Sequence, residues 1–135
     1  MNTILKPLAL TLIFIGGGFY SSIAQDSLQV ATSQHKTEVV ALRMEQELSL
    51  SKNQTQRVSV ILMERFETLK QANPNKTKHL ASANDVAIKK LAGILTAQQL
   101  TQYNQIRSET KTQKDEYLKN NPTYKFTDHE KEMDF

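Results

Sequence analysis

The side chains that could do chemistry in this sequence are few and widely spaced. The chain has 135 residues, three His and no Cys. No two histidines lie within four residues of each other, whereas zinc ligands usually gather at close spacing. The stretch DHEKEMD at 128–134 does combine one His with several carboxylates. We interpret it as a soluble acidic tail, with metal binding as the alternative, and we expect neither a metal nor a cofactor.

Patterns typical of catalysis are absent from the sequence. It contains no HExxH, no GxSxG and no Gly-rich phosphate-binding loop. The carboxylates Glu45 and Glu47 lie two residues apart, so a helix would direct them to different faces. We therefore expect that the protein is not an enzyme.

Basic and apolar side chains are mixed along one stretch, and such a mixture is what the binding of non-native proteins would need. A non-native protein exposes apolar groups and often negative charge, and opposite charge speeds encounter. Met suits variable partners because its side chain repacks easily. The candidate residues for such client binding are Arg57, Met63, Arg65, Phe66, Leu69 and Lys70. We predict that Arg65, Phe66 and Lys70 lie at the edge of a concave surface. The alternative is an apolar core with a solvated basic rim.

The elements that must position these residues are helices. Apolar residues recur at three- and four-residue steps, and no alternating strand pattern is present. Pro74 and Pro122 mark breaks, because the residue before a proline disfavours helical geometry. The pattern predicts an all-α domain over residues 25–120 with four helices, near 27–48, 52–72, 77–95 and 97–119. Residues 121–135 are predicted to be a mobile charged tail that docks through Tyr124 and Phe126.

One short pattern occurs at two of the predicted helix starts. The chain reads LSKNQ at 50–54 and LTAQQ at 95–99. In each copy a Ser or Thr can cap the helix, and the Gln three residues on can reach back to form a capping box. The Leu before the cap can pack against the first turn. The residues of this capping motif are Leu50, Ser51, Gln54, Leu95, Thr96 and Gln99.

The first 24 residues are typical of a secretory signal peptide. A short start with Lys6 precedes an apolar run at 8–15, and small residues lead to Ala24. We expect cleavage after Ala24, export to the periplasm, and no integral membrane segment in the mature chain. Export also disfavours nucleic acid as a partner. Leu, Ile, Val and Phe are sparse after this point, so we expect a shallow core that needs a second subunit.

The two motif copies in an exported, helical chain of this size resemble the Spy/CpxP family of periplasmic proteins, which is named for LTxxQ motifs. The first copy departs from that motif by Ser51 in place of Thr. The resemblance implies a thin, cradle-like hairpin assembly, usually a homodimer. It also implies an ATP-independent chaperone that binds unfolded or stress-damaged envelope proteins. The alternative is a partner-specific envelope-stress regulator or adaptor, or a metal-stress sensor, on the same fold.

Overall fold

The computed structural model describes residues 32–72 and 75–135, and within these ranges every regular element is a helix. The prediction of an all-α fold is therefore confirmed. The proposed signal peptide, the start of the first predicted helix and Pro74 lie outside the described residues. The helices are α2 (Ser33–Leu48), α3 (Lys52–Gln71), α4 (Lys76–Ala92), α5 (Ala97–Asn120) and α6 (Asp128–Met133).

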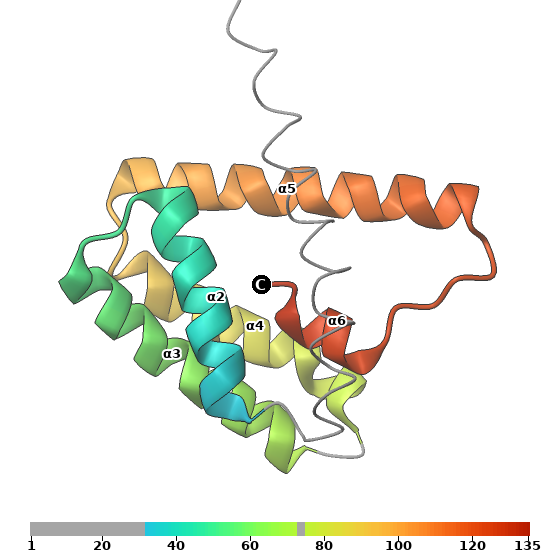
Figure 1. The fold of residues 1–135 in the computed structure, drawn as a ribbon, viewed down its shortest axis with the longest axis horizontal. Helices are drawn as coiled ribbons and strands as arrows, with labels where there is room; N and C mark the ends of the chain where they lie inside the picture. The colour runs from blue at the N-terminus through green and yellow to red at the C-terminus, as the bar shows by residue number, and fades with distance from the viewer. Residues whose placement is uncertain (1–31, 73–74) are drawn as a thin grey trace, which may run out of the picture. The chain divides into compact units, whose positions relative to one another are not determined.

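α2 and α3 form a hairpin through a tight turn (Figure 1). The turn begins at Ser49, which has a left-handed backbone (φ 51°) and donates its N–H to the carbonyl of Glu45. Buried side chains then recur along both helices. They are Val40, Met44 and Leu48 on α2, and Val58, Leu62, Phe66 and Leu69 on α3. Burying each such side chain contributes about 1.5–3 kcal/mol, so apolar packing holds the hairpin together.

The two motif copies cap α3 and α5 as expected from their sequence. The hydroxyl of Ser51 accepts from the N–H of Gln54 (3.1 Å), and the Ser51 N–H donates to Gln54 Oε1 (3.0 Å). Thr96 and Gln99 repeat the same pair of bonds at 3.2 and 3.0 Å. Leu50 and Leu95, which precede the caps, are both buried.

The structure also brings the two copies into direct contact. Gln54 Nε2 donates to Gln99 Oε1 (2.7 Å), and Gln99 Nε2 donates to Gln54 Oε1 (3.2 Å). Each amide reaches one further carbonyl at 3.3 Å, that of Ile94 for Gln54 and that of Leu48 for Gln99. The motif therefore joins the starts of α3 and α5 to each other, to the end of α2 and to the turn after α4.

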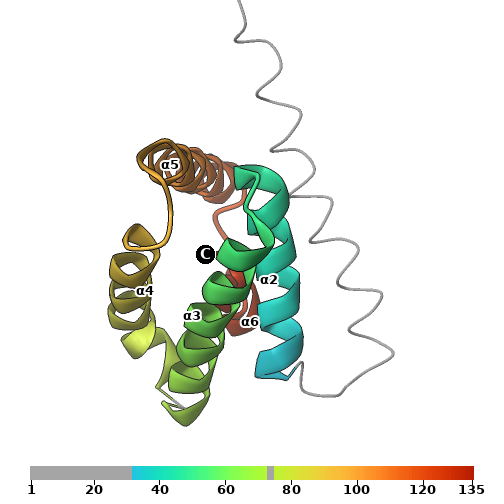
Figure 2. The same cartoon turned by 90° about the vertical axis from the view of Figure 1, so that its left-hand side faces the viewer.

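The remaining helices surround the end of the chain. α3 packs against both α2 and α4, and α5 contacts α2 (Figure 2). In both views the C-terminal end lies among α2, α3, α4 and α5. The side chain of Phe135 belongs to the same buried cluster as Leu62, Leu91 and Tyr103. The final residues thus complete the core that the long helices leave open.

The description of residues 121–135 as a mobile tail is corrected by the structure. Residues 128–133 form α6, which contacts α4, and Glu132 and Phe135 are buried. The physical reason is a third capping box, in which Thr127 and Glu130 exchange bonds of 3.1 and 2.7 Å. The T-x-x-E pattern at 127–130 was a signal for this helix start that the charge of the segment obscured.

Candidate functional site

The four residues 132–135, here called the C-terminal segment, are held by cationic side chains from the long helices. Two arginines bind its main chain. Arg65 Nη1 donates to the carbonyl of Glu132 (2.7 Å). Arg43 Nη2 donates to the main-chain oxygens of Met133 (3.2 Å) and Phe135 (2.8 Å). Bonds from a charged donor are among the stronger hydrogen bonds in proteins.

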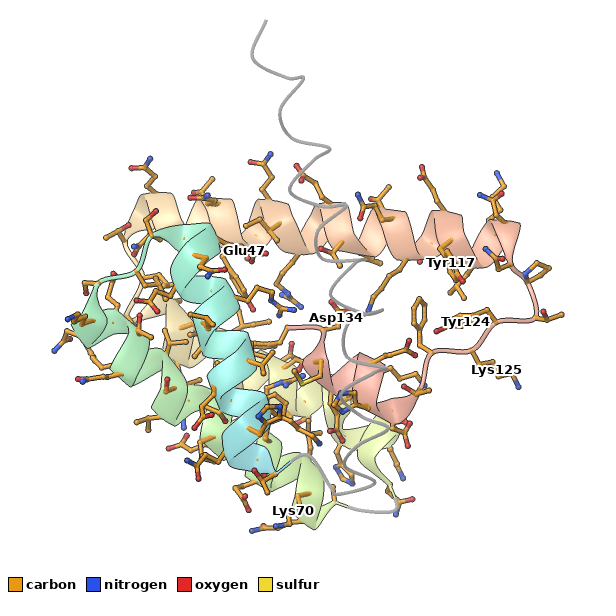
Figure 3. The ribbon with its side chains drawn as sticks, in the orientation of Figure 1. Glu47, Lys70, Tyr117, Tyr124, Lys125 and Asp134 are labelled. Carbon is orange, nitrogen blue, oxygen red and sulfur yellow. The ribbon has the colours of Figure 1, made fainter. Side chains whose placement is uncertain are left out.

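Three side chains of the same segment also find partners. Glu132 pairs with Lys36 at 2.5 Å, and both of these side chains are largely buried. Asp134 forms an ion pair with Lys114 on α5, and it lies between α6 and α5 (Figure 3). The Arg65 guanidinium stacks on the ring of Phe135, and its central carbon lies 4.5 Å from the centroid of that ring. We call the residues that receive the segment the docking site: Lys36, Arg43, Arg65, Tyr103 and Lys114.

Arg65 is the centre of the docking site. It is only 3% exposed, and its guanidinium lies between the rings of Phe66 (5.1 Å) and Phe135. Its Nε donates to Asn84 Oδ1 on α4 (2.7 Å). Burial lowers the pKa of Arg65 to about 10, so the group stays charged at neutral pH. One side chain therefore links α3, α4 and the C-terminal segment.

Two buried polar atoms at the docking site have no hydrogen-bond partner among the described residues. They are Arg65 Nη2 and the hydroxyl of Tyr103. Burial also raises the pKa of Tyr103 to about 12, so the phenol is neutral. The Tyr103 ring lies 6.1 Å from that of Phe135. An unpaired buried donor costs free energy. The site therefore fits the segment without satisfying every group that faces it.

An aromatic cluster sets the path of the chain between α5 and α6. Tyr117 and Tyr124 meet edge to face at 5.2 Å, and Tyr124 meets Phe126 in the same way at 5.1 Å. In Figure 3 Tyr117 on α5 and Tyr124 on the connection to α6 face each other, while Lys125 points away from the helices. The Tyr124 hydroxyl donates to Glu130 (2.7 Å). The expected docking through Tyr124 and Phe126 is thus seen, but neither residue belongs to the docking site.

The fold shifts the pKa of His129 on α6. Burial, followed by the positive charge of Lys36, lowers the pKa of His129, while Glu132 and Glu130 raise it by less. His35 on α2 acts in the same direction as Lys36. The neutral imidazole is therefore the form that suits the docked arrangement.

The candidate client-binding residues predicted from sequence do not form one exposed surface. Arg57 and Lys70 are exposed, and Figure 3 shows Lys70 at the far end of α3. In contrast, Arg65, Phe66 and Leu69 are buried, at 3%, 2% and 1% exposure, and Met63 is half-buried. Placing Arg65 and Phe66 at an exposed edge was therefore wrong for this structure. The reason is that the C-terminal segment covers Arg65, and core packing takes the apolar residues of α3.

A second feature is a shallow groove between α3 and α4, of about 180 Å³. It is lined by Ile61, Glu64, Arg65, Thr68, His79, Ser82, Ala83, Val86, Ala87 and Lys90.

Within residues 32–72 and 75–135, no three His, Asp or Glu side chains gather as a metal site would require. None of the helices in these ranges is long and apolar enough to cross a membrane.

Comparisons with protein-family models, with curated proteins and with solved structures find no match to this chain. The docking site and its occupant therefore carry the functional argument.

Proposed function

We propose that this protein is an exported, ATP-independent chaperone-like protein that binds segments of non-native proteins at its docking site. One observation carries the proposal: Arg43 and Arg65 hold a peptide segment by its main-chain oxygens. Every polypeptide offers these acceptors, so such contacts do not depend on sequence. The ring of Tyr103 and the guanidinium of Arg65 both contact the ring of Phe135, so together they provide a place for an aromatic side chain.

The resemblance to Spy/CpxP proteins supports the same proposal. With this resemblance, the proposal also includes cleavage near Ala24, a periplasmic location, a homodimer, and a cradle-like arrangement of the hairpin. The hairpin of α2 and α3, capped by the paired motif copies, is compatible with that arrangement. Exposed apolar side chains at Leu42, Val60 and Val86 offer further surface for a second subunit or a client.

The second candidate function is a partner-specific regulator or adaptor. It is favoured by the contacts that do depend on sequence, namely Lys36 with Glu132 and Lys114 with Asp134. A site that reads charges at two positions can select one partner. The two functions differ in breadth, since a chaperone protects unrelated clients and an adaptor binds one.

Light scattering tests the proposal. Two unrelated denatured clients are diluted into the purified protein without ATP, at low and moderate salt. We expect suppression of aggregation for both clients, weakening as salt screens the encounter. No suppression at several-fold molar excess, by the natural chain or by a Phe135→Ala variant, would leave the partner-specific regulator as the better account.

A matched pair of substitutions locates the surface that acts. In the Phe135→Ala chain, where the chain's own segment competes less, Arg43→Met removes a docking-site cation and Arg57→Met removes an exposed one on α3. Both remove one positive charge in the same way. We expect a loss of suppression only for Arg43→Met. An equal loss for Arg57→Met would return the function to the surface predicted from the sequence.

A further inference from the structure

The occupant of the docking site carries a recognisable chemical pattern. Its sequence is Glu-Met-Asp-Phe, and each of its first, third and fourth side chains has its own contact. Lys36 and Lys114 come from different helices and contact alternate residues of the segment. The ring of the fourth residue is buried between Arg65 and Tyr103.

We infer that the docking site recognises acidic segments of other proteins with the pattern acidic, any, acidic, aromatic, and that residues 132–135 are its resident competitor. This inference rests on the proposed function and gives it a preferred ligand. Lys36 and Lys114 pair with the first and third residues of the segment, so they select the two acidic positions. The contacts of Arg65 and Tyr103 with the fourth side chain select the aromatic position. The arginine bonds to main-chain oxygens add affinity without selecting sequence.

The connection of the segment to its site makes it an effective competitor. Only residues 121–127 lie between the end of α5 and the start of α6. A short tether gives a local concentration on the order of millimolar, so a foreign segment must outcompete it. The two buried donors without partners, on Arg65 and Tyr103, are groups that a better-fitting ligand can satisfy. Ligand binding and release of residues 132–135 are thereby coupled.

The test measures binding in trans of a labelled peptide with the sequence TDHEKEMDF, that of residues 127–135, by fluorescence anisotropy. The natural chain is compared with Phe135→Ala, which removes the buried anchor from the competitor but leaves the docking site intact. Because truncating a buried aromatic anchor costs at least about tenfold in affinity, we expect the variant to bind the peptide about tenfold more tightly. Thr123→Ala, at an exposed residue of the connection between α5 and α6, is the control and should bind as the natural chain does.

A second variant guards against a folding defect in Phe135→Ala. Asp134→Lys opposes Lys114 at a partly exposed pair, so it weakens the competitor without opening the core. It should also bind the peptide more tightly than the natural chain. A scrambled peptide of the same composition should bind no variant. If both variants keep their helical circular dichroism yet gain no binding, the inference is overturned.

A charge exchange tests the specificity directly. In the Phe135→Ala chain, Lys114→Glu should reverse the preference, so that a peptide with Lys in place of Asp134 binds better than the natural peptide. An unchanged preference would overturn the assignment of Lys114. A concentration-dependent dimer that forms through exchange of residues 132–135 would also overturn it, because a second copy would then be the occupant.

The result is separable from the proposed function. Tighter peptide binding without suppression of client aggregation would support the inference and reject the broad chaperone. Suppression of aggregation without any gain in peptide binding would support the broad chaperone and reject the inference.

Discussion

The contact between Gln54 and Gln99 predicts that the two motif copies act as one unit. Four hydrogen bonds involve the Gln54 side chain, and two of them are shared with Gln99. A typical hydrogen bond contributes about 1 kcal/mol net. Because the pair is partly exposed, Gln54→Ala should lower the free energy of unfolding by about 2–3 kcal/mol. The shared bonds should give a coupling energy of about 1–2 kcal/mol between the two residues.

A double-mutant cycle with urea denaturation measures this coupling. The natural chain, Gln54→Ala, Gln99→Ala and the double variant are compared at one pH and salt concentration. In a domain of this size, 1 kcal/mol corresponds to a shift in Tm of about 4–8 °C, so the effect is well above error. A coupling energy below about 0.5 kcal/mol would refute the reasoning, because each motif copy would then cap its own helix independently.

The third capping box supplies the control for this cycle. Glu130 caps α6 together with Thr127 and has no hydrogen bond to Gln54. The pair Gln54→Ala and Glu130→Ala should therefore be additive within about 0.5 kcal/mol. Gln54→Glu separates the two roles further, since the carboxylate keeps the acceptor for the Ser51 N–H and loses the donors to Gln99 and Ile94.

Three further predictions concern charges. Burial raises the pKa of Glu47, so its charged form opposes folding. Glu47→Gln should therefore stabilise the protein at neutral pH, and denaturant titrations should show this gain fading toward pH 4.5. The lowered pKa of His129 means that undocked α6 takes up a proton more readily, so docking should be strongest above about pH 6.5 and weaken below it. The weakening should appear as lower protection of the α6 amides from exchange, relative to the intrinsic rate at each pH, and should be absent in His129→Gln. Arg65→Glu should cost about 3–5 kcal/mol because it buries an unpaired charge, whereas the exposed Lys70→Glu should change stability by less than about 0.5 kcal/mol in the same denaturation assay.

The sequence by itself determined the local elements of this protein. Apolar spacing and two capping motifs located α3 and α5 closely, because a helix start depends on residues within about four positions of each other. The same logic applies to α6, where the pattern from Thr127 to Glu130 was present but was outweighed by the charge of the segment.

Tertiary structure decided what covers each helix face. Sequence spacing shows that Arg65 and Phe66 share a helix, but it does not show that residues 67 positions away bury Arg65. The meeting of Gln54 and Gln99, 45 residues apart, is equally invisible to a local pattern. Such contacts depend on how segments pack in space. A cation expected at a rim therefore became the buried centre of the docking site, and a charged tail became its occupant.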